Sequence, residues 1–375
     1  MKNTWGNNLQ ISLFGESHGP AIGVVIDGLG AGIELDMAFI NGQLDKRKPK
    51  GKISTQRQEG DQFEIVSGVF QGRTTGTPLC LLIRNQSQHS KDYEATKYLV
   101  RPSHADFTAF EKYHGYQDYR GGGHFSGRIT APLVAAGAIC LQILRDKGIT
   151  VASHIRTCKG IEDIPFSNDQ GEILQAAALL NERYFPTISA EAGEKMVSLI
   201  EDAHKKGDSV GGVLETVVVG MPTAIGEPFF GSVESVLSGL LFSVPAVKGV
   251  AFGEGFGFAD LYGSEANDAF AVENGKIVTK TNHNGGINGG ITNGMPLRIQ
   301  TVIKPTPSIY QEQDTVDYRK GENAKLTIHG RHDPAIIHRA RVVVDSVVAI
   351  GLVDLFCERY GYTWMEPKEE KEGTQ

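Results

Sequence analysis

The residues with the clearest chemical potential lie between Asp118 and Thr130, in the run Asp-Tyr-Arg-Gly-Gly-Gly-His-Phe-Ser-Gly-Arg-Ile-Thr. Three consecutive glycines permit backbone conformations that a side chain forbids, and they let peptide N–H groups approach a ligand closely. Arg120 and Arg128 flank them with forked donors suited to phosphate or carboxylate. The apolar pattern from Ala131 predicts a helix whose N-terminus favours negative charge. A solvated turn is the alternative, but this residue set favours an anion-binding loop.

A second polar motif, Gly-Glu-Ser-His-Gly, occupies residues 15–19. It matches Gly-x-Ser-x-Gly, the nucleophile elbow of serine hydrolases, but that elbow requires a helix after the serine. Pro20 and the apolar run 22–26 predict a second strand instead. We therefore interpret Ser17 and His18 as a polar pair presented to a ligand, with a histidine that can exchange a proton near pH 7. A serine hydrolase using Ser17 is one alternative, which covalent labelling by a fluorophosphonate would favour.

A basic strip stands out in a chain whose formal net charge is −7. Its six cations, with no acidic residue among them, are Lys46, Arg47, Lys48, Lys50, Lys52 and Arg57. The acidic balance argues against a general nucleic-acid or membrane-surface role, whereas a concentrated strip fits a small polyanion. It is not a Walker loop, because isoleucine follows Lys52. The alternatives are a solvated surface run and a non-catalytic flavin- or polyanion-binding protein.

Two further polar segments, residues 101–106 and 330–334, lie at or just before the start of a predicted helix. His104 stands in the segment 101–106, close in sequence to Arg101 and to the glycine loop. Residues 330–334 form a polar bend, with Arg331 and Asp333, ahead of a long apolar run. The eleven histidines include no H-E-x-x-H or comparable spacing, which argues against a metal site.

The elements that must position these residues follow from hydrophobic periodicity and from helix start signals. Strands are predicted at 9–14, 22–26, 63–70, 79–83, 149–155, 212–219, 297–303 and 326–328. Helices are predicted at 36–44, from Pro102 to about 114, and at 131–147, 171–181, 189–206, 233–242 and 336–358.

Composition describes an ordinary globular chain with an excess of glycine, 46 of 375 residues. The first ten residues are polar, so we expect no signal peptide, and no uncharged apolar run approaches the roughly 18 residues that span a bilayer. The cysteines are Cys80, Cys140, Cys158 and Cys357. Their wide separation, without a C-x-x-C pair, predicts reduced thiols in a cytoplasmic protein.

The chain also repeats itself. The pattern Gly-x-Thr-x-Gly-x-Pro-Leu begins at residue 72 and again at residue 290. A Gly-Arg pair precedes a long apolar run at 127–128 and again at 330–331. We infer two similar halves related by an approximate two-fold axis, although glycine-rich strands can match by chance. If the halves pack face to face, their Gly-Arg bends meet at one cleft.

Over nearly its whole length the chain resembles chorismate synthase. The motifs that carry the resemblance are residues 15–19, 101–106, 120–123, 282–290, 304–309 and 330–334. The resemblance implies 1,4-anti elimination of phosphate from 5-enolpyruvylshikimate 3-phosphate to give chorismate, with reduced FMN and no net redox change. This substrate carries two carboxylates and a phosphate, so its cleft needs several fixed cations.

The resemblance also implies roles for individual residues. The expected catalytic residues are His18 as proton donor to the phosphate, His104 beside the reduced flavin, and Asp333, acting with the flavin N5 in removing the ring hydrogen. The expected substrate-binding residues are Ser17, Arg47, Arg101, Arg128 and Arg331. The expected FMN-binding residues are Arg47, Lys52, His124, Phe125, Ser126, Pro245, Ala246, Gly289, Lys304, Pro305, Thr306, Pro307, Ser308 and Arg331.

Some positions depart from the family pattern. Many members read Arg-Ser-Ser-Ala-Arg-Glu-Thr where this chain has residues 124–130. Lys52 stands where an arginine is frequent, which loses bidentate geometry, and Pro307 replaces a frequent serine. The side chains of His124 and Phe125, which would contact the flavin, therefore differ from those of many members.

The implied fold is a single α+β domain, a β-α-β sandwich of two similar halves. We place the domain at 1–365, with halves at 1–148 and 207–360, a helical connection at 160–206 and a charged tail at 366–375. The resemblance further implies a homotetramer without nucleic-acid or membrane partners. NADPH enters only as a reductant, and the lack of large insertions favours a separate flavin reductase.

Overall fold

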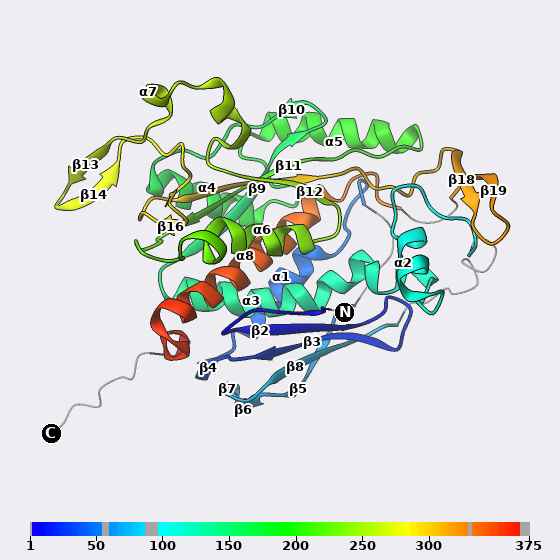
Figure 1. Cartoon of the computed structure of the whole chain (residues 1–375), viewed down its shortest axis with the longest axis horizontal. Helices are drawn as coiled ribbons and strands as arrows, with labels where there is room; N and C mark the ends of the chain where they lie inside the picture. The colour runs from blue at the N-terminus through cyan, green and yellow to red at the C-terminus, as the bar shows by residue number, and fades with distance from the viewer. Residues whose placement is uncertain (1, 55–59, 87–96, 329–331, 368–375) are drawn as a thin grey trace.

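A computed structural model describes residues 2–54, 60–86, 97–328 and 332–367. Two five-stranded antiparallel sheets enclose a layer of helices, and a further pair of helices covers the outer face of the second sheet (Figure 1). This β-α-β sandwich confirms the α+β class predicted from the sequence. The limits of the domain, of its halves and of its tail stay predictions.

The first sheet has the strand order β1-β2-β3-β8-β5. Its strands are β1 (Thr4–Trp5), β2 (Gln10–Gly15), β3 (Ala21–Asp27), β8 (Leu79–Arg84) and β5 (Phe63–Ser67). Along β8 the residues alternate between buried and more exposed, because one face packs on the helices. A smaller sheet of β4 (Ala31–Glu34), β7 (Arg73–Thr75) and β6 (Val69–Phe70) lies beside it.

The second sheet repeats that arrangement, with the order β10-β9-β11-β17-β12. Its strands are β10 (Ile161–Glu162), β9 (Thr150–Cys158), β11 (Gly212–Val219), β17 (Leu297–Ile303) and β12 (Val247–Phe252). The bounds of β11 and β17 coincide with the predicted strands. The sheet also takes in β9 and β10, which precede the range 207–360 assigned to the second half.

The repeated glycine motif makes the same hydrogen bonds in both halves. Thr74 Oγ1 donates to the Gly30 carbonyl at 2.7 Å and accepts from the Ile33 amide at 3.0 Å. Thr292 Oγ1 donates to the Pro222 carbonyl and accepts from the Ile225 amide at the same two distances. Matching bonds at matching strand positions confirm the internal duplication.

The helical layer consists of α1 (Met37–Arg47), α3 (Thr130–Asp146), α6 (Val233–Ser243) and α8 (Ile337–Tyr360). Helices α3 and α8 cross so closely that a Cβ on Gly137 would lie 2.2 Å from the Ser346 Cβ. Residues 127–146 are long and apolar enough to cross a membrane by composition, but 94% of an apolar 18-residue window within them is buried inside the protein. It is therefore the core helix of this fold. The four cysteines are free, and three of them are buried.

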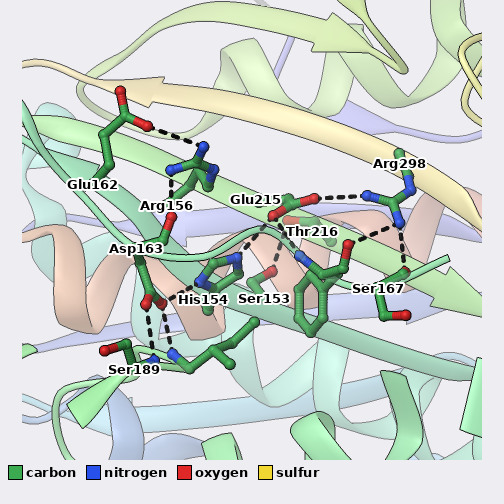
Figure 2. Close-up of polar contacts among 12 residues, drawn as sticks. Ser153, His154, Arg156, Glu162, Asp163, Ser167, Ser189, Glu215, Thr216 and Arg298 are labelled. Carbon is green, nitrogen blue, oxygen red and sulfur yellow. Dashed lines mark hydrogen bonds and ion pairs between the residues drawn. The ribbon is translucent and has the colours of Figure 1, made fainter. Parts of the chain in front are cut away.

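The outer layer consists of α4 (Gln170–Glu182) and α5 (Ala190–Lys205). A cluster of charged side chains attaches the connecting segments to the second sheet (Figure 2). His154 Nδ1 lies 2.9 Å from Asp163 Oδ2, and its Nε2 lies 2.8 Å from Glu215 Oε2. Arg298 contacts the other Glu215 oxygen at 3.1 Å. We call these four residues the buried cluster.

The remaining elements lie toward the two ends of the molecule in Figure 1. They are α2 (Asp106–Tyr113), the hairpins β13–β14 (Phe270–Glu273, Lys276–Thr279), β15–β16 (Ile287–Asn288, Ile291–Thr292) and β18–β19 (Gln313–Asp317, Glu322–Leu326), the short helix α7 (Gly263–Ala266), and the 3-10 turns η2 (Arg120–Phe125), η3 (Gly127–Ile129), η4 (Phe229–Gly231), η5 (Gly255–Asp260) and η6 (Tyr362–Met365). The strand predicted at 326–328 was wrong. Residues 322–326 form it instead, because they pair with 313–317.

Candidate functional site

The glycine loop forms the turn η2, and all three of its glycines have positive φ, between 53° and 88°. A Cβ on Gly121 would lie 2.2 Å from His18 Cε1, and one on Gly122 would lie 3.2 Å from His104 Cε1. Glycine is therefore required here because two histidine rings press against the backbone. The loop joins the two predicted catalytic histidines, which are 86 residues apart in sequence.

Ser17 and His18 lie in the bend between β2 and β3 and are both buried. Ser17 Oγ lies 3.0 Å from His18 Nδ1 and 3.2 Å from the Arg120 carbonyl oxygen. When the hydroxyl donates to that carbonyl, His18 must donate from Nδ1. A strand follows the serine, so the nucleophile elbow lacks its helix.

His104 is held by a carboxylate for which the sequence patterns indicated no role. Asp106, the first residue of α2, lies 2.8 Å from His104 Nδ1. Arg101 binds the same carboxylate through Nε at 2.7 Å and Nη2 at 2.6 Å. Burial raises the pKa of Asp106, but these hydrogen bonds outweigh it and hold the pKa well below its usual range. We call Arg101, His104 and Asp106 the cleft cluster.

A second unforeseen carboxylate joins two of the predicted substrate arginines. Arg47 Nη2 lies 2.5 Å from Asp61 Oδ2, and Arg128 Nη1 contacts Asp61 Oδ1. All three side chains are almost completely buried. Burial raises the pKa of Asp61, but Arg47 and then Arg128 outweigh it, so the pKa is lowered. Arg128 Nε also bonds Asn85 Oδ1 at 3.2 Å.

The basic strip does not act as one surface patch. Lys46 turns inward to Asn181 Oδ1 at 2.9 Å, and burial together with Arg341 lowers its pKa to about 8. Lys48 pairs with Asp45 at 2.6 Å. Lys50 and Lys52 are exposed. Arg57 lies outside the described residues.

Several predicted FMN residues come together around the cleft cluster. Lys304 Nζ donates to the Ser103 carbonyl at 2.6 Å, and its backbone N–H donates to the Ala246 carbonyl at 2.9 Å. These bonds join three predicted segments: Pro245 and Ala246, the turn of Lys304, Pro305, Thr306, Pro307 and Ser308, and the loop that bears His104.

The other predicted FMN positions are divided between two places. His124 Nδ1 lies 2.8 Å from the Gly15 carbonyl, and the Ser126 hydroxyl accepts from the Arg128 amide at 3.3 Å. The Phe125 ring lies 6.1 Å from that of Tyr113. Gly289 lies in the β15–β16 hairpin, at the end of the molecule opposite α2 (Figure 1). Within a single chain, Gly289 therefore lies away from the cleft cluster.

The bend before α8 is described only in part, because Arg331 lies outside the described residues. Asp333 is buried and contacts Arg339 through its Oδ2. Burial, and then Arg101, lowers the pKa of His332. Because Arg101 and His104 both act on the charge of His332, this bend lies close to the cleft cluster.

These residues fit a phosphate-bearing flavin. Among the described residues, Thr306 Oγ1 and His332 Nε2 are buried side-chain atoms without a hydrogen-bond partner. Such atoms are costly unless a ligand or water binds them. Within the described ranges, no group of three His, Cys, Asp or Glu could hold a metal ion.

Comparisons with known proteins agree on one family. The family model described as chorismate synthase matches residues 9–357. A chorismate synthase from Aeropyrum pernix is 44% identical over 96% of this chain and 93% of its own. One from Thermococcus kodakarensis is 43% identical over 96% and 99%. A crystal structure of chorismate synthase superposes with a TM-score of 0.75 at 26% identity, covering 95% of this chain and 94% of that one.

Proposed function

Because the chain belongs to the chorismate synthase family, lyases of the shikimate pathway, we propose that it eliminates phosphate from 5-enolpyruvylshikimate 3-phosphate by 1,4-anti elimination to give chorismate. The reaction uses reduced FMN without net redox change. The observation that carries the proposal is the convergence of Arg47 and Arg128 on Asp61, beside a glycine loop that packs on His18 and His104.

The arginines hold a substrate with three anionic groups. Arg47 and Arg128 are already desolvated in the folded protein, so when a substrate anion binds, only the anion still has to lose its water. Ser17 adds a hydroxyl donor in the same bend. Arg101 contributes less, since Asp106 holds its Nε and Nη2. Arg331 and its role stay a prediction.

His18 supplies the proton that the departing phosphate needs. Its burial against Gly121 excludes water from the ring, and Ser17 fixes its Nδ1 side. His104 packs against the next glycine, Gly122, and is oriented by Asp106. Asp333, beside Arg339, accepts the ring proton that is removed during the elimination.

The flavin would lie between the loop of His124 to Ser126 and the turn of Lys304 to Ser308, where Thr306 and His332 have unpaired atoms. When bound in its reduced form, FMN supplies transient electron density to the elimination. Lys52 and Arg47 are the further cations for its phosphate.

We also propose the assembly and setting that the family implies. These are a cytoplasmic homotetramer, a separate flavin reductase in place of intrinsic NADPH oxidation, and no nucleic-acid or membrane partner. In a tetramer, Gly289 would reach FMN only if its hairpin contacted the cleft of a neighbouring subunit. Sedimentation would measure the assembly, and comparing photoreduced FMN with NADPH alone would test the reductase.

The decisive test is the variant His18→Ala in an anaerobic assay of phosphate and chorismate release with photoreduced FMN. We expect a folded protein that loses most of its turnover, by about 10²- to 10⁴-fold. Near-normal activity would refute the role of His18. Labelling of wild-type Ser17 by a fluorophosphonate, with no flavin-dependent phosphate release, would favour the hydrolase instead.

A further inference from the structure

A hydrogen-bonded cluster with no assigned role lies at the start of α8. Ser54 Oγ lies 2.8 Å from Tyr184 Oη and 2.8 Å from His338 Nε2. Tyr184 Oη also lies 3.1 Å from His338 Nε2 and contacts the Lys50 carbonyl. Ser54 lies in the segment after α1, Tyr184 in the connection between α4 and α5, and His338 in the first turn of α8. They therefore join three segments that are distant in sequence.

The direction of these bonds follows from the available donors. A carbonyl only accepts, so the Tyr184 hydroxyl donates to Lys50. Tyr184 Oη then accepts from Ser54, and Ser54 Oγ accepts from His338 Nε2–H. This tautomer leaves His338 Nδ1 as a lone pair, and that atom has no partner among the described residues. Burial lowers the pKa of His338 to about 3, which agrees with a neutral ring.

This arrangement is not a catalytic serine-histidine pair. In such a pair a carboxylate or amide orients Nδ1 of the histidine, whereas Nδ1 of His338 has no partner in the part of the chain that the structure describes. Ser54 and His338 are also almost fully buried. The chain of bonds ends on a backbone carbonyl, so its effect is to fix the backbone of residues 48–54.

Residues 48–54 connect the site where Arg47 and Arg128 bind Asp61 with the two exposed lysines. The segment begins directly after Arg47, which binds Asp61, and it carries Lys50 and Lys52. Gly51 has φ of +70°, and a Cβ there would lie 3.5 Å from the Tyr184 ring. On the other side, His338 is followed by Arg339, which contacts Asp333. Tyr184 thus packs against the segment that carries Lys50 and Lys52.

We propose that Tyr184 is a positioning residue that, through Ser54 and His338, holds residues 48–54 in the conformation that binds the FMN phosphate. This inference rests on the proposed function, because FMN is the ligand assigned to Lys52 and Arg47. It also gives the 160–206 segment a role, because that segment then supports the phosphate-binding loop of the first half.

The test is the variant Tyr184→Phe, which keeps the ring and removes only the hydroxyl. We expect the dissociation constant for FMN, measured by fluorescence titration, to rise about three- to tenfold, as for one lost hydrogen bond. At saturating FMN, kcat should stay near the wild-type value. Tyr116→Phe is the matched control, because Tyr116 is 92% exposed, and it should leave the titration unchanged.

A second variant separates positioning from general stability. Ser54→Ala interrupts the same chain, so we expect it to weaken FMN binding similarly and the double variant to be no weaker than either single one. Fully additive losses, or unchanged FMN affinity with a lowered melting temperature, would overturn the inference. Failure of the wild-type protein to bind FMN would instead overturn the proposed function, and this inference with it.

Discussion

The cleft cluster and the buried cluster are built from the same residue types but differ in access. In the cleft cluster, His104 Nδ1 lies 2.8 Å from Asp106 and 3.1 Å from Arg101 Nη2, and Nε2 has no partner among the described residues. In the buried cluster, carboxylates bind both nitrogens of His154, and the ring is fully enclosed. The His104 side chain is 19% exposed and that of His154 is 0% exposed. The partly exposed ring with an unpaired Nε2 therefore distinguishes His104 as the histidine suited to chemistry.

The buried cluster instead serves attachment. Asp163 accepts from the amides of Ile188 and Ser189 at 2.6 and 2.8 Å, which anchors the start of α5. Glu215 accepts from the Phe166 amide at 3.1 Å. Every polar atom of the His154 ring is thus committed to holding the outer helical layer on the second sheet (Figure 2).

The largest expected effect comes from His104→Ala. Loss of the ring beside the glycine loop should lower turnover by about 10²- to 10⁴-fold, because a positioned proton-transfer group is worth that much. Thermal unfolding should change little, since the ring is partly exposed. Turnover within a few-fold of wild type in the anaerobic assay would show that His104, like His154, takes no direct part in the reaction. The contrast between the two clusters would then be wrong.

The reverse result is expected for His154→Leu. Removing the ring leaves Asp163 and Glu215 buried without their shared partner, which should lower the free energy of unfolding by about 3–5 kcal/mol. Urea unfolding would measure the loss, and turnover of the folded fraction should be retained. His114→Asn is the control, because His114 is exposed and asparagine tolerates its φ of +56°.

A smaller effect is expected for Asp106→Asn. Without the carboxylate, His104 loses the partner that fixes its Nδ1 proton, and turnover should fall about 10- to 100-fold. Glu64→Gln is the control. Glu64 binds Arg84 Nε at 2.9 Å and Nη2 at 3.4 Å, and no histidine among the described residues contacts it. Equal losses in the two variants would mean that the arginine pair, rather than His104, accounts for the effect.

The smallest expected effect is a pH dependence of stability. Burial lowers the pKa of His154, but Asp163 and Glu215 outweigh it, so the pKa is raised above its ordinary value of 6.5. The stabilisation is therefore complete below pH 6.5 and is lost as the pH rises through the raised pKa. The urea midpoint of wild type should decline over that range more than that of His154→Leu. Parallel curves would contradict this assignment.

The sequence predicted the elements better than the contacts. Strands β11 and β17 could be placed because their branched apolar residues are continuous or alternate. The β18–β19 hairpin could not, since its residues are mostly polar and only cross-strand pairing defines it. The motif at 72 and 290 predicted the duplication because its threonines make equivalent bonds.

The histidines, the arginines and Asp333 of the candidate site were predicted from the sequence, whereas Asp61 and Asp106 were not. Asp61 binds an arginine 67 residues away, and no local pattern indicates that pairing. Asp106 did have a signal, since it follows His104 by two residues at a helix start. Aspartates beside predicted anion-binding arginines are the residues to examine first in such a sequence.

The close crossing of α3 and α8 has a consequence for how the chain can be divided. Every residue from Thr130 to Leu144 in α3 and from Ala340 to Cys357 in α8 is buried, and each helix belongs to a different half. A fragment cut between the halves would present a long bare stripe of alanine, valine and leucine to water. The two fragments should consequently be insoluble when made separately and recover a common fold only when produced together.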